Sequence, residues 1–366
     1  MTSLLETFCG KVVVVTGHTG FKGSWLAAWL KHLGAHVVGI SLDPPSVPSH
    51  YVAASIHSGL TDLRIDILND IELNQVFADT QPDFVFHLAA QPLVRLSYED
   101  PIHTWKVNTM GTLHVLESLR AVQKSCSAVI VTSDKCYDNV EWVWGYKETD
   151  RVGGPDPYSA SKGAAELAIS SYIKSFFPKQ TSLVRIASAR AGNVIGGGDW
   201  AADRIVPDCV RAWSLGNHVE LRRPHSTRPW QHVLEPLSGY LALASVLAQQ
   251  PFLHGEPFNF GPLAQQNHSV LELVQEMALH WPEVRWRDVS DGFLGPYESN
   301  LLKLNCDKAL HHLKWQAVMS FDDTVKMTAD WYRSYYEKSA SVHRVTSEQI
   351  DSYTQLAMKQ GLSWAC

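Results

Sequence analysis

The chain has 366 residues, of which 45% are hydrophobic and 19% charged, and its formal net charge is −6. This length and composition are typical of one large or two fused globular domains, and the mild, evenly spread negative charge argues against nucleic acid as a partner. No stretch reaches the roughly 18 apolar residues of a membrane span, and no cationic region precedes an apolar run at the N-terminus, so we predict neither a transmembrane segment nor a signal peptide.

The first strong pattern is the segment KVVVVTGHTGFKGSWL at residues 11–26. Val12–Val15 predicts a strand buried on both faces, three glycines follow at a GxxGxxG spacing, and an apolar helical pattern continues from them. This order can bind the pyrophosphate of a dinucleotide, because glycines admit close approach and a helix N-terminus offers free N–H groups. A glycine turn without a ligand is the plain alternative. The candidate cofactor contacts here are Gly17, Gly20, Phe21 and Gly23.

A second strand is expected at His36–Leu42. An acidic residue near the end of this strand would bind the adenosine ribose and favour NAD over NADP. Ser41 occupies the expected place and Asp43 lies slightly beyond it. Both are candidate cofactor contacts, and the choice between NAD and NADP stays open at this point.

The third and fourth strands, expected at Leu63–Ile67 and Asp83–Leu88, end in further candidate contacts. Small residues after the fourth strand allow a cofactor to approach, although small residues also simply pack. A plain turn aspartate explains Asp66 as well as an adenine contact does. The candidate cofactor contacts at these strand ends are Asp66, Ile67, Leu88, Ala89 and Ala90, and Gln91 follows as a candidate substrate contact.

A long helix is expected at Pro101–Arg120, with Asn108 in its middle as a candidate cofactor contact. The fifth strand, Ser127–Thr132, then delivers polar residues to its carboxyl end, which is the edge where ligands bind in open α/β sheets. The residues that follow the strand at this edge are Ser133, Asp134, Lys135 and Tyr137, and they are candidate site residues.

The next helix, Tyr158–Phe177, begins with the pattern YxxxK. Tyr158 and Lys162 are one helical turn apart and share a face. A nearby ammonium lowers the pKa of a phenol from about 10 and makes it a usable base. Alone, the pattern is more often a surface pair. Combined with the glycine turn and Ser133, it predicts a catalytic site in which Ser133 holds the substrate hydroxyl.

A sixth strand at Ser182–Ala189 completes an alternation that predicts an α/β fold with a doubly wound parallel sheet of the Rossmann type. We predict an NAD-binding domain at residues 1–190 and a smaller, mixed substrate-binding region at residues 191–366. Residues 230–262 contain a helical and a strand pattern and are expected to return to the sheet. Three tryptophans are expected in the core, namely Trp281, Trp286 and Trp315.

Together, the glycine turn, the strand-end serine and the YxxxK helix resemble the extended short-chain dehydrogenase/reductase family over essentially the whole chain. TSDKCY at residues 132–137 is similar to the motif of the nucleotide-sugar 4,6-dehydratases, which typically carry Thr-Asp-Glu where this chain has Ser-Asp-Lys. GHTGFKGSWL at residues 17–26 and RPWQHV at residues 228–233 are most similar to the branch of that family that acts on CDP-glucose.

This resemblance implies a tightly bound NAD that is regenerated in each turnover, and CDP-glucose as the substrate. The implied reaction is oxidation at carbon 4, loss of water across carbons 5 and 6, and hydride return to carbon 6. Tyr158 would take the proton from the 4-hydroxyl, and Asp134 would protonate the departing 6-hydroxyl. A strand-end aspartate without a catalytic role is the plain alternative for Asp134.

Lys135 departs from the family pattern, because the usual glutamate can remove the carbon-5 proton and a protonated lysine cannot. Burial beside Lys162 and NAD would favour a neutral Lys135, since desolvation and like charge both lower a lysine pKa. Alternatively, Lys135 stays a cation and stabilises the enolate while another group moves the proton.

The resemblance also implies Asn193 as a sugar or phosphate contact, and Arg204 and Arg228 as diphosphate contacts, although a plain ion pair also explains each arginine. Relatives pair through two helices, so we expect a homodimer or homotetramer formed by the helices that begin at Pro101 and Tyr158. The apolar faces of these helices fit burial against the sheet equally well.

Six widely spaced cysteines without a CxxC pair favour free thiols in a reducing cytoplasm, and no metal site is predicted.

Two other functions share part of this pattern. A nucleotide-sugar 4-epimerase needs the glycines and the Tyr158/Lys162 pair but no acid at Asp134, because no hydroxyl leaves. A dinucleotide-sensing protein without turnover would often lack the Tyr/Lys pair, which is present here. We therefore expect a hydro-lyase of deoxysugar and O-antigen precursor biosynthesis, with the epimerase as the nearest alternative.

Overall fold

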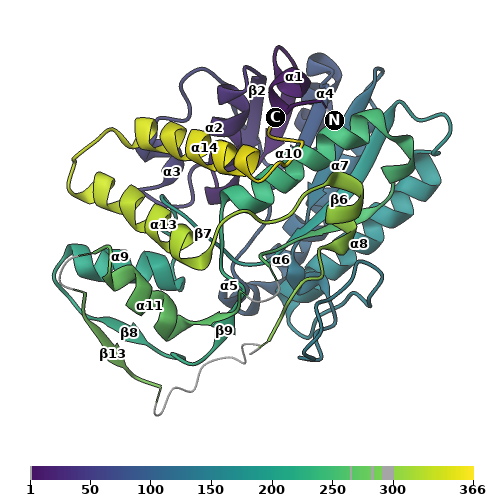
Figure 1. The fold of residues 1–366 in the computed structure, drawn as a ribbon. Helices are drawn as coiled ribbons and strands as arrows, with labels where there is room; N and C mark the ends of the chain where they lie inside the picture. The colour runs from purple at the N-terminus through teal and green to yellow at the C-terminus, as the bar shows by residue number, and fades with distance from the viewer. Residues whose placement is uncertain (1, 264–265, 282–283, 291–300) are drawn as a thin grey trace.

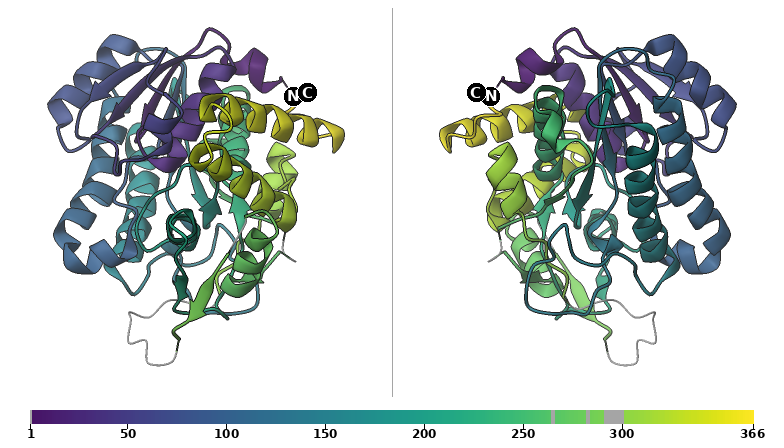
Figure 2. Two further views of the ribbon diagram at one scale, coloured as in Figure 1. Left: turned by 90° about the vertical axis from the view of Figure 1, so that its left-hand side faces the viewer. Right: turned by 90° about the vertical axis from the view of Figure 1, so that its right-hand side faces the viewer.

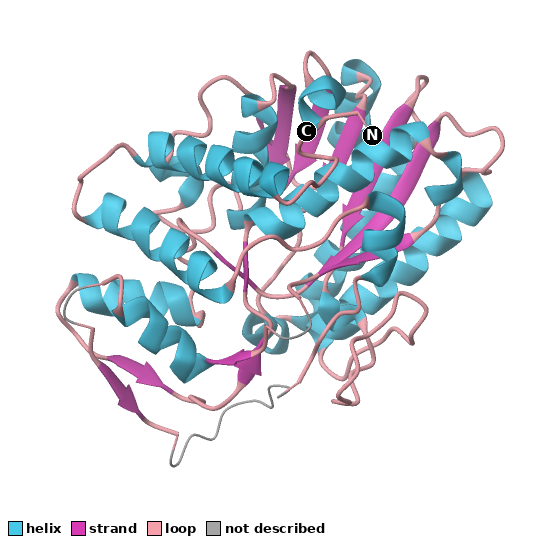
Figure 3. Cartoon of the chain, viewed as in Figure 1, coloured by secondary structure: helices cyan, strands magenta, loops and turns pink. Residues whose placement is uncertain are grey.

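The computed structural model describes residues 2–263, 266–281, 284–290 and 301–366. At its centre is a seven-stranded sheet with the order β11-β6-β5-β4-β1-β2-β3, in which all neighbouring strands are parallel (Figures 1 and 3). The doubly wound parallel sheet is therefore confirmed. The strands are β1 Val12–Thr16, β2 His36–Ser41, β3 Thr61–Arg64, β4 Phe84–His87, β5 Cys126–Val131, β6 Val184–Ala191 and β11 Pro257–Phe260.

Helices cover both faces of the sheet because its strands are apolar on both faces. Val13 and Val15 belong to one buried cluster and Val14 to another, as the two-residue alternation of a strand requires. The first face is covered by α2 (Phe21–His32), α10 (Leu234–Gln249) and α14 (Val342–Lys359). The second is covered by α4 (Asp70–Thr80), α7 (Gly111–Leu119) and α8 (Pro157–Phe176).

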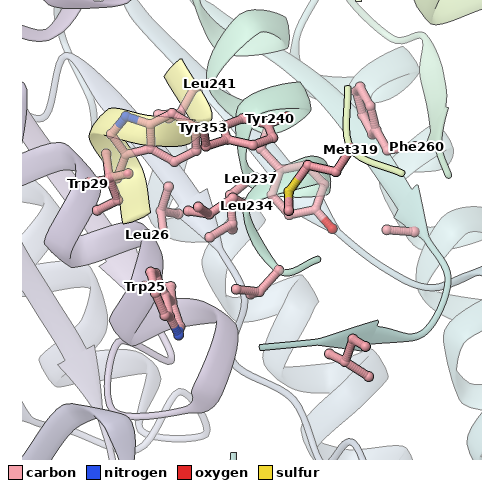
Figure 4. Close-up of a cluster of buried hydrophobic side chains, with 14 of the residues drawn as sticks. Trp25, Leu26, Trp29, Leu234, Leu237, Tyr240, Leu241, Phe260, Met319 and Tyr353 are labelled. Atoms are coloured by element: carbon pink, nitrogen blue, oxygen red, sulfur yellow. The ribbon is translucent and has the colours of Figure 1, made fainter. Parts of the chain in front are cut away.

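Aromatic side chains join the helices of the first face. Trp25 and Trp29 of α2 lie near Leu234, Leu237 and Leu241 of α10, with the ring of Tyr353 on α14 close to them (Figure 4). Nearly every side chain of α10 is buried, which explains why its sequence is apolar around the whole helix. The two chain ends lie side by side (Figure 2), and the Leu4 N–H donates to the Trp364 carbonyl.

The helix expected at residues 101–120 is interrupted. The structure has α6 (Pro101–Trp105), a π-helical turn η1 (Lys106–Met110) and then α7. A π turn inserts extra backbone without breaking the apolar pattern, so periodicity does not reveal it. The other short helices are α1 Leu4–Phe8, α3 His50–Ala53, α5 Val94–Glu99, η2 Asp134–Cys136 and η3 Pro251–Leu253.

A smaller region below the carboxyl edge of the sheet combines helices with short strand pairs (Figure 3). Its strands pair as β10 with β7, β12 with β9, and β13 with β8. They are β7 Val194–Ile195, β8 Val219–Leu221, β9 Thr227–Arg228, β10 Gln231–His232, β12 His268–Ser269 and β13 Trp286–Asp288. The remaining helices are α9 Ile205–Ser214, α11 Val270–Ala278, α12 Asp307–Leu313 and α13 Phe321–Tyr336.

Two of the three tryptophans expected in the core are buried, namely Trp281 and Trp315. The prediction for Trp286 is wrong, because Trp286 is 38% exposed on the outer strand β13. Within the described residues, none of the helices has both the length and the apolar composition needed to cross a membrane.

Candidate active site

The glycine turn between β1 and α2 has the geometry that its sequence requires. Gly17 has φ +78°, and a Cβ at this position would lie 2.7 Å from the Ala89 backbone N. A Cβ at Gly23 would lie 2.0 Å from the Gly17 carbonyl O. Both positions therefore exclude side chains, the first by conformation and close approach and the second by packing of α2 on the turn.

The N-terminus of α2 offers an anion site. Gly20 is its N-cap, and no side chain of the described residues caps it by a hydrogen bond. The first-turn N–H groups, which begin at Phe21, are then available to a phosphate at the positive end of the helix dipole. These features fit the pyrophosphate of a dinucleotide.

The end of β2 is where the adenosine ribose of such a cofactor would lie. Ser41 shares a 2.7 Å hydrogen bond with Thr19 of the glycine turn. The side chain of Asp43 is 93% exposed and lies 3.9 Å from the Arg64 guanidinium. The same guanidinium donates to the Leu42 carbonyl at 2.8 Å, so an arginine crosses the end of β2.

The other candidate cofactor contacts lie at neighbouring strand ends. Leu88, Ala89 and Ala90 follow β4 and are half-buried. Asp66 accepts a hydrogen bond from the Leu68 N–H at 2.9 Å, as a turn aspartate does. Ile67 is buried and would contact a side chain added at Gly111, which places it in the packing between its turn and α7.

The structure brings the predicted catalytic side chains together. Ser133 and Asp134 follow β5 in the turn η2 and are buried, and the Ser133 hydroxyl donates to Asp134 at 2.9 Å. The Tyr158 phenol on α8 lies close enough to Ser133 for the serine side chain to lower its pKa. Lys162 lies one turn further along α8 and is also buried. Serine, carboxyl and phenol therefore lie near one another, and the lysine lies on the same helix as the phenol.

Burial dominates the ionisation of this cluster. It raises the pKa of Tyr158 to about 12, against opposing effects of Ser133 and the Arg204 cation. Burial also lowers the pKa of Lys162 to about 8 and raises that of Asp134, although the cations of Lys135 and Lys22 oppose the latter shift. A carboxyl that keeps its proton more readily is suited to act as an acid.

A small pocket of about 20 Å³ lies beside Asp134 and contains several residues assigned to the substrate. Its walls are Asp134, Lys135, Asn193, Arg228, Pro229 and Leu302. Lys135 is half-buried and Asn193 is exposed. The structure therefore places the candidate substrate contacts Asn193 and Arg228 next to the catalytic turn. A larger cavity of about 250 Å³, lined by Glu166, Arg190 and others, contains none of the predicted site residues.

Arg204 is held at the entrance to α9, where its guanidinium forms a 2.6 Å ion pair with Asp199. The Tyr332 hydroxyl donates a hydrogen bond to the Asp199 backbone carbonyl. The Arg204 cation also lowers the pKa of Tyr158. Arg204 therefore forms the plain ion pair, and its charge also acts on Tyr158.

Gln91 and Asn108 form hydrogen bonds within the protein interior. The Gln91 carboxamide donates to Thr104 and to the Leu93 carbonyl and accepts from the Leu93 N–H. These bonds hold the amide group of Gln91 against its own loop and against Thr104 of α6, and its assignment as a substrate contact stays a prediction. Asn108 bonds the Gln91 backbone and the Ser161 hydroxyl, so it ties this loop to α8.

Sequence reasoning missed Lys22. It lies in the first turn of α2, and burial lowers its pKa to about 8, while the charge of Asp134 raises it. The signal was a single cation between the second and third glycines of the turn, next to Phe21.

A parallel sheet with a glycine turn, a Ser-Asp turn after β5 and a Tyr/Lys pair on α8 defines an extended short-chain dehydrogenase/reductase. More specifically, the chain belongs to the GDP-mannose 4,6 dehydratase family, whose model matches residues 14–328. It is 46% identical over 331 residues to CDP-glucose 4,6-dehydratase of Salmonella typhimurium, with 89% of this chain and 91% of the relative covered. UDP-glucose 4-epimerase of Mycoplasma pneumoniae is 23% identical, with 75% and 83% covered.

Solved structures share the fold at lower identity. UDP-glucuronic acid 4-epimerase from Bacillus cereus, in complex with UDP-glucuronic acid and NAD, superposes with a TM-score of 0.75 at 23% identity, covering 89% of this chain and 100% of that one. dTDP-glucose 4,6-dehydratase from Bacillus anthracis, in complex with NAD, gives 0.72 at 19% identity and covers 90% and 98%. The predicted family is confirmed, and the epimerases are distant relatives.

Proposed function

We propose that this protein is an NAD-dependent hydro-lyase that converts CDP-glucose to CDP-4-dehydro-6-deoxyglucose and water. The observation that carries the proposal is the buried carboxyl of Asp134, in contact with Ser133 beside Tyr158. An epimerase has no leaving hydroxyl and needs no such acid. The 46% identity to a CDP-glucose 4,6-dehydratase supports the same choice and the nucleotide base.

The glycine turn, the N-terminus of α2 and Ser41 are the groups that would hold NAD. When bound, NAD supplies a hydride acceptor at carbon 4 and a hydride donor at carbon 6. Tyr158 would remove the proton of the 4-hydroxyl while Ser133 orients that hydroxyl. The raised pKa of Tyr158 must fall for this step, and the positive charges of Lys162 and of a bound nicotinamide ring would act in that direction.

Elimination requires an acid at the 6-hydroxyl and a base at carbon 5. Asp134 is the acid, because burial favours its protonated form. Lys135 lies beside it and faces the same small pocket. In the first alternative, a neutral Lys135 takes the carbon-5 proton. In the second, its ammonium stabilises the enolate and another group moves the proton.

Asn193 is proposed to contact the sugar or a phosphate and Arg228 the diphosphate, both from the pocket beside the catalytic turn. Arg204, whose charge lowers the pKa of Tyr158, is proposed as a second diphosphate contact. A guanidinium presents paired donors to paired phosphate oxygens. If the diphosphate replaced Asp199 as the partner of Arg204, the positive charge of the Arg204 guanidinium would act on the substrate.

We also propose that two copies pair through α6, η1 and α8, as a homodimer or within a homotetramer. These elements expose large apolar side chains, which are Ile102, Trp105, Met110, Leu167 and Phe176. Such a surface is unusual on a monomer.

All six cysteines are free thiols, which supports the reducing cytoplasm as the location.

The test is incubation of the purified protein with CDP-glucose and no added reductant, followed by mass spectrometry. The proposal predicts a product lighter than CDP-glucose by one water. A product of unchanged mass with inverted carbon 4 would instead identify a 4-epimerase. Recovery of unaltered CDP-glucose, with or without bound NAD, would reject catalysis on this substrate.

A further inference from the structure

Behind the catalytic turn lies a buried ion pair that the proposed chemistry does not use. Glu166 is on α8, one helical turn past Lys162, and Arg190 is on β6. An Arg190 Nη2 lies 2.8 Å from Glu166 Oε2, and the two side chains are only 4% and 6% exposed. Burying two charges costs about as much as their attraction returns, so such pairs are poor stabilisers. A role in positioning is the better explanation.

The ion pair is bonded to both ends of the catalytic turn. The Thr132 hydroxyl donates to Glu166 Oε1 at 2.5 Å, and Thr132 directly precedes Ser133. At the other end, an Arg190 Nη1 donates to the Tyr137 hydroxyl at 2.8 Å, and the guanidinium lies 4.9 Å from the centre of the Tyr137 ring. Tyr137 directly follows η2. We call these four residues, Thr132, Glu166, Arg190 and Tyr137, the clasp.

We infer that the clasp is a positioning device, which sets the turn carrying Ser133 and Asp134 against the helix carrying Tyr158. The inference deepens the proposed function and rests on it for its kinetic part. Glu166 is rigidly placed on the same helix as the phenol, so its bond to Thr132 fixes the strand end relative to that helix. Proton transfer depends steeply on such distances, and a shift of about 1 Å can cost roughly a hundredfold in rate.

The chain offers a matched control. The Ser188 hydroxyl donates to Glu166 Oε2 at 2.9 Å, so it binds the same carboxylate as Thr132. Ser188 lies on β6 and pairs in register with Ile130 and Pro257, away from the turn. Thr132→Val and Ser188→Ala each remove one hydroxyl bond to Glu166, but only the first cuts the link to the catalytic turn. Thr132→Ser keeps the hydroxyl and serves as the rescue.

The first measurement is steady-state turnover of CDP-glucose. Thr132→Val should lower kcat by roughly ten- to a hundredfold and change KM by less than about threefold, because substrate contacts are untouched. Ser188→Ala should stay within about threefold of the wild-type kcat, and Thr132→Ser should recover most of the lost activity. A purely structural ion pair would make the valine and alanine variants behave alike.

The second measurement is backbone amide hydrogen exchange of the full-length protein, which needs no activity. Within the turn, the Cys136 N–H donates to the Ser133 carbonyl and the Tyr137 N–H to the Asp134 carbonyl. Thr132→Val should speed exchange in the peptide spanning residues 133–137 by at least about fivefold, and Ser188→Ala should not. Equal kcat in the two variants, or exchange in this peptide that is unchanged by Thr132→Val, would overturn the inference. If even the wild type fails to convert CDP-glucose, the proposed function is rejected and the exchange result alone decides on the clasp.

Discussion

Glu235 makes the stability of this fold depend on pH. It lies in the first turn of α10 and is 1% exposed. Its carboxylate accepts hydrogen bonds from the N–H groups of Val318 and Met319 at 2.8 and 2.7 Å, and from the Tyr353 hydroxyl at 2.7 Å. Burial outweighs these bonds and raises the pKa of Glu235 from 4.5 to about 7.

The sign of the effect follows from proton linkage. The folded protein binds the Glu235 proton more tightly than the unfolded chain, so this group favours folding most below pH 4.5 and loses that contribution as the pH rises through about 7. The difference between the two pKa values corresponds to about 3 kcal/mol. The side chain is fully buried, so solvent screening does not reduce this value.

Glu235→Gln removes the ionisation and keeps an oxygen that can accept from the two N–H groups. Between about pH 5 and about pH 8, the unfolding free energy of the wild type should fall by up to about 3 kcal/mol more than that of the variant. Urea unfolding followed by tryptophan fluorescence at both pH values measures this difference. Parallel pH dependence of the two proteins would refute the reasoning, since all other titrating groups are shared.

Three further substitutions test the site. Gly17→Ala places a Cβ 2.7 Å from the Ala89 backbone at φ +78°, so the purified variant should carry less than about a tenth of the wild-type NAD on acid extraction; a full complement of NAD would contradict the role of the turn. Lys135→Met should block elimination but spare oxidation at carbon 4, so the absorbance of reduced nicotinamide should rise in a single turnover and persist; unchanged turnover would exclude a role for Lys135. Ser41→Asp puts a carboxylate at the end of β2 and should raise the Kd for NADP relative to NAD by at least about tenfold; an unchanged ratio in equilibrium competition would place the ribose elsewhere.

The parts of the site that sequence alone predicted are those encoded over a few residues. The turn at Gly17 requires a residue without a Cβ, and the sequence shows directly that this residue is glycine. The place of Asp134 was predicted from the buried strand before it, because the carboxyl ends of parallel strands meet at one edge, while its role as an acid was implied by the family resemblance. Tyr158 and Lys162 were predicted from their spacing of one helical turn combined with the glycine turn and Ser133.

The parts that sequence did not predict depend on contacts between distant segments. Nothing in the sequence marks Glu166 and Arg190 as partners, because they come together only when α8 packs beside β6. Their hydrogen bonds to the catalytic turn join residues that are 34 and 53 positions apart. The hydrogen bond between Gln91 and Thr104 was not predicted either, because it depends on how α6 packs against the loop after β4. Trp286 was misjudged because hydrophobicity does not tell whether a strand lies at the outer edge of its region.

If Tyr158 as base and Asp134 as acid act on the same hexose beside a bound NAD, the hydride taken from carbon 4 returns to carbon 6 of the same sugar, and an isotope label on carbon 4 follows it. CDP-glucose deuterated at carbon 4 would be turned over in ordinary water and the product examined by NMR. We expect deuterium in the new methyl group at carbon 6. Deuterium that stays on carbon 4 beside an intact 6-hydroxyl, or that is washed out into the solvent, would contradict this expectation.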